Sequence, residues 1–166
     1  MTEAPLGGQD SRPEENPQSR DDSQAPHGDA YTWYQRGLEL LGRGSAAAAA
    51  QLLERAAEAE PGARSVLEAL ARAQFDTRRY AAAARTFRQI VEASPSDDYA
   101  QFGLGLALAR DGNPSAAAEH LALAAAMRPE LQHYTDALRG VRATLKARSE
   151  AAGGRPAGGD DGMSRR

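Results

Sequence analysis

Small and apolar residues recur along the middle of the chain with a period of 34 residues. The clearest markers of this period are Pro61, Pro95 and Pro129, which are separated by 34 and 34 residues. A period of this length is typical of helix–turn–helix repeats, in which each unit pairs two amphipathic helices. The pattern therefore predicts three helical hairpins, over residues 30–63, 64–97 and 98–131.

Three positions of each repeat carry small side chains, which indicates where helices approach each other closely. A branched side chain at these positions would leave no room between the two helices of a hairpin or between successive hairpins. Leu53, Phe87 and Leu121 are expected to fill the remaining space. The small positions are Gly37, Ala71 and Gly105, then Ala49, Ala83 and Ala117, then Ala56, Ile90 and Ala124, of which only Ile90 is large.

Each predicted hairpin also contains a turn with its own polar or glycine residues. The turns lie at residues 42–45, 76–79 and 111–114. In the third turn, Asn113 is a suitable N-cap and Pro114 is expected at the first position of the following helix. Period, small positions and turns agree independently on the same helical boundaries.

With this period and these small positions, residues 30–129 resemble the tetratricopeptide repeat family. The resemblance implies an all-α fold, a right-handed α-solenoid of three hairpins closed by a capping helix, with disordered termini. Three residues depart from the large side chains that are usual in the family, namely Arg36, Gln74 and Gln101. One hairpin cannot bury its apolar face alone, and about three repeats are needed for stability.

After Pro129 the pattern supplies one more amphipathic helix and no complete fourth hairpin. Tyr134, Leu138, Val141 and Leu145 recur at spacings of 4, 3 and 4. We expect residues 130–149 to form a capping helix with a polar outer face. A second interpretation is a basic stripe for an acidic partner, formed by Arg139, Arg142 and Lys146, although cations near a helix C-terminus are favoured in any case.

Composition separates the repeats from the two ends of the chain. Residues 1–28 carry six acids, two arginines and four prolines with almost no apolar side chains, and residues 150–166 are rich in glycine. Both segments are expected to be disordered, because they have too little apolar surface to offset the entropy of ordering. The net charge is only −3, so no general attraction to nucleic acid or to an anionic membrane follows. No apolar stretch is long enough to span a membrane, and a cytoplasmic location is the default expectation.

The resemblance to tetratricopeptide repeats implies that the first helix of each hairpin lines a concave groove with one of its faces. Most residues at these positions are apolar or aromatic, and we expect Tyr34, Phe75 and Phe102 to anchor a partner. Leu38, Leu106 and part of Phe75 have a second interpretation as core residues. The candidate groove residues are Tyr31, Tyr34, Leu38, Glu68, Arg72, Phe75, Tyr99, Phe102 and Leu106.

The charges of this groove limit the kind of ligand it is expected to hold. Some family members bind a C-terminal carboxylate through lysine, asparagine and arginine, but here those positions hold Tyr34, Leu38, Ala69, Tyr99 and Gly103. Glu68 and Arg72 are four residues apart and are expected to pair with each other. The sequence thus favours an apolar or amphipathic peptide segment as the partner. Occupation of the groove by the chain's own acidic N-terminal segment or by a second copy is the alternative.

Nothing in the sequence indicates catalysis. The chain has no cysteine, and its histidines, His27, His120 and His133, stand without acids at metal-ligand spacing. Gly103 and Gly105 fall inside a predicted helix with no preceding strand, which argues against a dinucleotide site. The sequence therefore predicts a protein-binding scaffold or adaptor without metal or cofactor, and not an enzyme.

Overall fold

The computed structural model describes residues 29–153, which form seven α-helices. The expected tails therefore lie mostly outside the described residues, at 1–28 and 154–166. The helices are α1 (Ala30–Gly42), α2 (Ala46–Ala59), α3 (Arg64–Asp76), α4 (Tyr80–Ala93), α5 (Asp98–Arg110), α6 (Pro114–Met127) and α7 (Gln132–Gly153).

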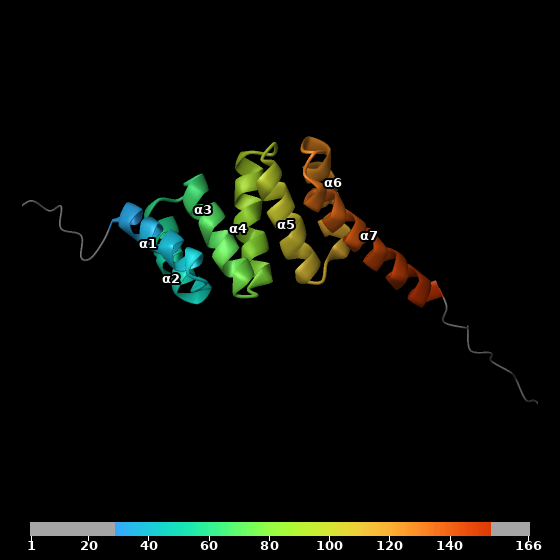
Figure 1. The fold of residues 1–166 in the computed structure, drawn as a ribbon, viewed down its shortest axis with the longest axis horizontal. Coiled ribbons are helices and arrows are strands. Elements are labelled where there is room, and N and C mark those ends of the chain that lie inside the picture. Colours follow the sequence, from blue (N-terminus) through green and yellow to red (C-terminus); the bar gives the residue numbers. More distant parts are fainter. Residues whose placement is uncertain (1–28, 154–166) are drawn as a thin grey trace, which may run out of the picture.

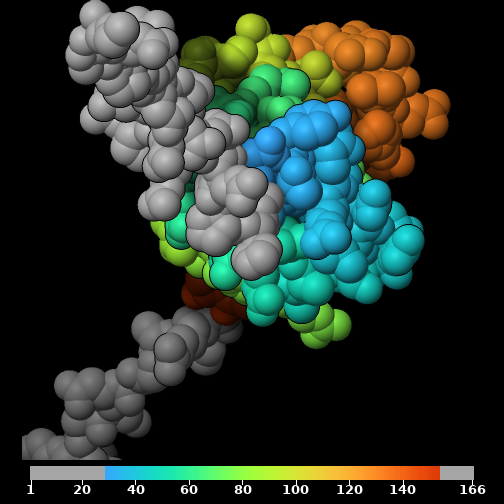
Figure 2. Space-filling view, turned by 90° about the vertical axis from the view of Figure 1, so that its left-hand side faces the viewer, coloured from blue at the N-terminus to red at the C-terminus, as the bar shows by residue number. Residues whose placement is uncertain are grey.

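The helices stand side by side in chain order, each packed on the next (Figure 1). First helices also contact the following first helix, since α1 touches α3, α3 touches α5 and α5 touches α7, whereas among the described helices the backbones of α2 and α4, and of α4 and α6, do not come close. The array therefore curves with α1, α3 and α5 on its inner, concave side. Viewed from the α1 end, α6 lies to one side of the first hairpin (Figure 2). The expected all-α solenoid is confirmed.

Close approach at the small positions holds each hairpin together. Leu53 and Leu121 are fully buried, and a Cβ built on the facing glycine would lie 2.6 Å from the Cγ atom of the leucine in both cases, for Gly37 against Leu53 and for Gly105 against Leu121. Real Cβ atoms do not come this close, so the helix axes are too near for any side chain. The predicted small positions are all buried in the structure, Ile90 included.

The turn inside each hairpin has the same backbone geometry three times. The amide of Ser45, Arg79 and Asn113 donates to the carbonyl of the residue five positions earlier, with N···O distances of 2.8, 2.8 and 2.9 Å. The residue before each donor has a positive φ, which glycine adopts at Gly44 and Gly112 without strain. The second turn uses Arg78, with φ 61°, at the same position.

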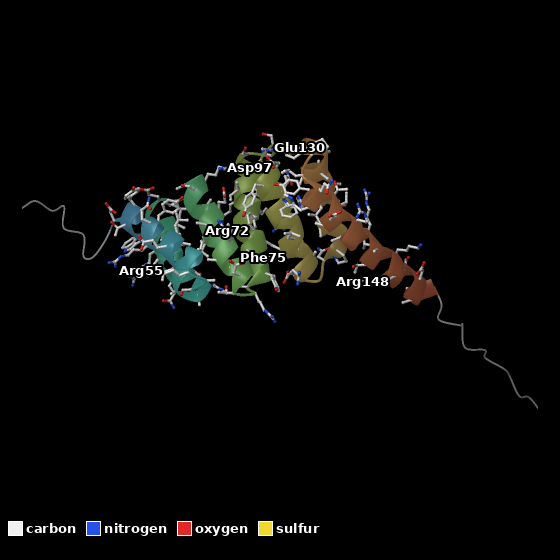
Figure 3. The ribbon with its side chains drawn as sticks, in the orientation of Figure 1. Arg55, Arg72, Phe75, Asp97, Glu130 and Arg148 are labelled. Atoms are coloured by element: carbon white, nitrogen blue, oxygen red, sulfur yellow. The ribbon has the colours of Figure 1, made fainter. Side chains whose placement is uncertain are left out.

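Side-chain caps begin the helices of the third repeat. Asn113 accepts a bond from the Ala116 amide at 3.2 Å and Pro114 is the first residue of α6, which confirms both expectations. Asp97 accepts from the Ala100 amide at 3.0 Å and starts α5. The loop with Asp97 and the loop with Glu130 lie at the same edge of the array (Figure 3).

The first helix is polar on the side that faces away from the array. Four positions that are buried in α3 and α5 against the preceding helix are exposed and polar in α1. These residues are Thr32, Gln35, Arg36 and Glu39, which stand 34 residues before Val66, Ala69, Leu70 and Ala73. Arg36 departs from the family pattern on a face of α1 where, among residues 29–153, no other helix packs.

The last described helix, α7, is built like the first helix of a fourth repeat, and within residues 29–153 no second helix follows it. Tyr134, Leu138 and Val141 occupy the positions that pack on the preceding repeat, and all three are buried. The position that must be small for a second helix to approach is instead Arg139, which is exposed. Compared with the expected range 130–149, α7 begins two residues later and ends four residues later, so residues 150–153 are helical and not part of a tail.

Two glycine substitutions with opposite expected effects test the packing. Gly105→Ala should lower the free energy of unfolding by about 1–3 kcal/mol, because the new Cβ overlaps Leu121 and approaches the Ala117 carbonyl oxygen. At Gly140, on the exposed part of α7, an added Cβ meets no atom within 4 Å. Gly140→Ala should therefore raise the free energy of unfolding by about 0.5–1 kcal/mol through its higher helix propensity. Urea denaturation measures both, and a stabilising Gly105→Ala would contradict the close approach.

Removal of the capping helix should destabilise the array. A chain that ends after Pro129 loses the buried side chains of Tyr134, Leu138 and Val141, which contribute about 1.5–3 kcal/mol each at most. We expect a lower melting temperature and increased binding of an apolar dye. A chain that ends after Gly153 keeps all of α7 and serves as the control. Equal melting curves for the two chains would show that α7 does not cap the array.

Candidate functional site

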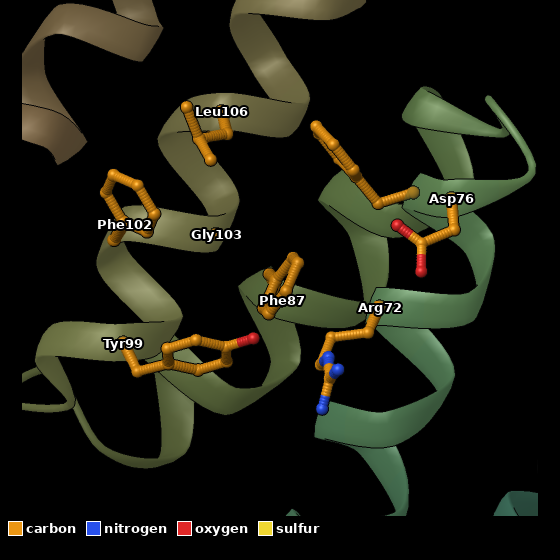
Figure 4. A pocket seen from close by; sticks show the side chains of 8 residues that line it. Arg72, Asp76, Phe87, Tyr99, Phe102, Gly103 and Leu106 are labelled. Carbon is orange, nitrogen blue, oxygen red and sulfur yellow. The ribbon is translucent and has the colours of Figure 1, made fainter. Parts of the chain in front are cut away.

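A pocket of about 150 Å³ opens on the concave side between α3 and α5. It is lined from α3 by Arg72, Phe75 and Asp76, from α4 by Phe87, and from α5 by Tyr99, Phe102, Gly103 and Leu106 (Figure 4). Five of the nine candidate groove residues therefore surround a single pocket, namely Arg72, Phe75, Tyr99, Phe102 and Leu106. Most of its lining is aromatic or aliphatic.

Phe87 and Gly103 complete this pocket, although the sequence did not indicate them as groove residues. Phe87 fills the hairpin of the second repeat, as expected, but its ring also reaches across to α5. A Cβ built on Gly103 would lie 2.4 Å from Cζ of Phe87, so only a glycine leaves room for this ring. The ring of Tyr99 meets Phe87 edge to face, with centroids 6.2 Å apart. The sequence feature that could have indicated this contact is a glycine inside a predicted helix, at a position where the other repeats have Gln35 and Ala69.

Phe102 packs on the capping helix as well as lining the pocket. Its ring stacks on Tyr134 of α7, with centroids 4.3 Å apart and planes 19° apart, and meets the His133 ring edge to face at 5.3 Å. One side of Phe102 thus holds the capping helix, and the other side borders the pocket. Such contacts are favourable geometries for aromatic pairs.

The remaining apolar candidates contribute differently to the concave face. Phe75 and Leu106 are half-buried against the core formed by α3 to α7, and they also line the pocket. These two residues are therefore both core residues and groove residues. Tyr34 and Leu38 pack on the core of the first hairpin, which includes Leu53, and do not line the pocket. Tyr31 is 67% exposed. The structure therefore does not gather the nine candidates into one site.

The expected pair between Glu68 and Arg72 is absent. Glu68 pairs with Arg64 instead, at 3.4 Å, and Arg64 also bonds Asp97, the N-cap residue of α5, at 2.6 Å. Glu68 has an arginine four residues before it, Arg64, and another four residues after it, Arg72. The bond to the half-buried Asp97 holds the Arg64 side chain near Glu68. Among residues 29–153, neither Arg72 nor Asp76 forms an ion pair, and both are exposed at the pocket.

Burial and charge act together on two titrating groups beside the pocket. Burial raises the pKa of the Tyr99 phenol, while the nearby charge of Arg72 opposes this shift. At Asp97, burial alone would raise the pKa, but the bonds from Arg64 and from the Ala100 amide outweigh it and hold the pKa below its usual value. Tyr99 is therefore neutral and Asp97 ionised near pH 7.

Two of the departures from the family pattern form polar links inside the core. Gln74 accepts a bond from the Thr86 hydroxyl at 2.8 Å, which joins α3 to α4. Gln101 donates to the Pro95 carbonyl at 2.9 Å and accepts from His120 Nδ1 at 2.8 Å, which joins α5 to α6. Burial lowers the pKa of His120. His120 thus has a structural partner, and within residues 29–153 no three acids or histidines are grouped to hold a metal ion.

Tyr134 links the capping helix to the start of α5. Its hydroxyl donates to Asp98 Oδ2 at 3.0 Å. Burial, followed by this bond and the charge of Asp98, raises the pKa of Tyr134 to about 12. The folded chain therefore prefers the neutral phenol beyond the pH at which a free tyrosine ionises.

Fold and site together define a helical repeat array with an apolar pocket on its concave side. The family model for the tetratricopeptide repeat matches residues 34–98 and 69–132, which together span more than half of the chain. The chain belongs to the tetratricopeptide repeat family. Members of this family are generally protein-interaction modules and not enzymes.

Several solved structures share this fold at low sequence identity. MamA 41-end from Desulfovibrio magneticus RS-1 has 22% identity and a TM-score of 0.69, covering 75% of this chain and 70% of that one. The first TPR of Spaghetti (RPAP3) bound to HSP90 peptide SRMEEVD has 19% identity and a TM-score of 0.67, covering 71% and 94%. YrrB, described as a TPR protein with an unusual peptide-binding site, has 19% identity and a TM-score of 0.64, covering 68% and 58%.

No curated protein sequence gives a significant match to the chain. Among the described helices, none has the length and apolar character needed to cross a membrane.

The raised pKa of Tyr134 predicts a loss of stability in alkali. Because the folded pKa lies above the unfolded value of about 10, the contribution of Tyr134 is fully present below pH 10 and is lost as the pH rises toward 12. The difference in free energy of unfolding between wild type and Tyr134→Phe should change by up to about 3 kcal/mol between pH 9 and pH 12. Urea denaturation across this range measures the difference, and a constant value would show that Tyr134 does not carry the effect.

Proposed function

We propose that the chain binds a partner protein through an apolar or amphipathic peptide segment on its concave face. The observation that carries this proposal is the pocket between α3 and α5, whose walls are Phe75, Tyr99, Phe102 and Leu106. Open apolar surface is costly in water, and a pocket of this kind is a common site for a partner's side chain. Tyr31 is exposed and Tyr34 half-buried on α1, outside the pocket.

Similar structures support a peptide as the ligand. The first TPR of Spaghetti (RPAP3) is described with an HSP90 peptide bound, and YrrB is described with a peptide-binding site. The lysine, asparagine and arginine positions of a carboxylate clamp are here Tyr34, Leu38, Ala69, Tyr99 and Gly103. We therefore expect an internal or side-chain-anchored segment, and not recognition of a free C-terminus.

The alternative function is self-association, with a second copy or the chain's own N-terminal segment in the groove. The exposed ring of Tyr31 at the α1 end favours a further contact there. Stacking end to end is disfavoured, because Arg36 at one end and Arg139 at the other present charge where repeats would pack. Light scattering over a wide range of concentration separates a second copy from the other occupants of the groove, since a monomer at all concentrations excludes a second copy.

A double substitution in the groove tests the binding proposal. Tyr34→Ala with Phe102→Ala should reduce capture of specific partners from lysate at least about tenfold, because aromatic anchors dominate such interfaces. Quantitative mass spectrometry of the captured proteins measures the loss. Circular dichroism well below the melting temperature should show unchanged helical content, although the melting temperature itself should fall because Phe102 also stacks on Tyr134.

Two control variants separate loss of the groove from loss of stability. Leu123→Ala removes an apolar side chain that is 47% exposed on α6, outside the pocket, and should leave capture unchanged. Tyr134→Ala removes the stack behind Phe102 without removing a lining side chain, and it should weaken the capping helix while partners are retained. Equal capture by wild type and the groove double variant would remove this face from consideration.

A further inference from the structure

The pocket between α3 and α5 has the size of one aromatic ring. Its volume is about 150 Å³. An apolar cavity of about this volume in another protein accepts a single benzene molecule. Phe75, Phe102 and Leu106 form apolar walls, so that an aromatic ring entering from the concave side is surrounded by apolar side chains.

The floor of this pocket arises from two coordinated departures from the other repeats. The filling residue of the second hairpin is Phe87, where the other hairpins have Leu53 and Leu121. The residue it reaches is Gly103, where the other first helices have Gln35 and Ala69. The longer ring and the missing Cβ fit each other, and only this junction combines them in the array.

The rim of the pocket carries two opposite charges that remain unused. Arg72 and Asp76 both project from α3, with the guanidinium toward the Tyr99 end and the carboxylate toward the opposite end (Figure 4). Neither forms an ion pair among residues 29–153. Exposed charges of opposite sign that do not pair with each other are available to a ligand.

From the ring-sized cavity and these two unpaired charges, we infer that the pocket is a socket for one aromatic side chain of a partner peptide. An acidic residue on one flank of that aromatic residue meets Arg72, and a basic residue on the other flank meets Asp76. The ring supplies the apolar burial and the two charges fix the direction of the segment. This inference rests on the proposed function, because it specifies the ligand of the same face.

Four short peptides test the socket directly. They are Ac-Asp-Phe-Lys-NH2, its reverse Ac-Lys-Phe-Asp-NH2, the neutral Ac-Ala-Phe-Ala-NH2 and the ring-free Ac-Asp-Ala-Lys-NH2. Titration into the full ¹⁵N-labelled chain should shift the amide signals of Tyr99, Phe102 and Gly103 with the three phenylalanine peptides. We expect weak binding, with a dissociation constant of about 1 mM, because a single side chain supplies the apolar contact.

The flanking charges should then separate the peptides. One of the two charged orders should bind about two- to tenfold more tightly than the neutral peptide, since each exposed ion pair contributes little. The ring-free peptide should bind at least about tenfold more weakly than the preferred order. Arg72→Gln and Asp76→Asn should each reduce the ratio of affinities between the preferred charged order and the neutral peptide. Arg85→Gln, an exposed arginine outside the pocket, should change nothing.

Results that overturn the socket differ from results that overturn the proposed function. The socket is wrong if the ring-free peptide binds as well as the others, if the shifts map away from α3 and α5, or if Arg72→Gln leaves the charge preference intact. Gly103→Ala should abolish the shifts because its Cβ displaces Phe87, and binding that persists in a folded Gly103→Ala variant would also overturn it. If the socket is wrong, partner capture that depends on Tyr34 and Phe102 can still be observed, and the proposed function then stands. If the short peptides bind as expected but no such capture is found, only the proposed function is overturned.

Discussion

The close approach of neighbouring helices determines most of this structure. Leu53 and Leu121 each lie directly over a glycine that has no room for a Cβ, and alanines occupy the other small positions except for Ile90. Because neighbouring helices lie so close together, each hairpin buries its apolar face against the following hairpin. The repeats therefore stack in one direction. The concave side follows from the same geometry, since the backbones of successive first helices come close to one another and those of the described second helices do not.

The pocket is a local variation on this packing. In the second hairpin the filling side chain is the longer Phe87, which extends past its own hairpin to the bare backbone at Gly103. The cavity beside it is therefore built from the residues that hold the array together, and not from an added loop. Phe102 has the same double role, because it borders the pocket and supports Tyr134 of the capping helix. Changes at these residues affect binding and stability together.

Much of the fold was predictable from the sequence, because a fixed period records contacts between equivalent positions. Gly37, Ala71 and Gly105 identify the close contacts through their spacing alone, and Asn113 with Pro114 identifies a helix start. The site was less predictable. Arg64 and Arg72 both lie four residues from Glu68, so spacing alone could not decide between them, whereas the bond from Arg64 to Asp97 is a contact in space that the sequence does not indicate. Gln101 and His120 form a buried link for the same reason.

Protection from hydrogen exchange in the presence of a captured partner tests the central claim most directly. If the partner lies on the concave face, amide exchange should slow in the peptides that cover α3 and α5, and residues of α2 and the outer side of α6 around Leu123 should exchange as in the free chain. Slower exchange confined to α2 and α6, with α3 and α5 unchanged, would contradict the account.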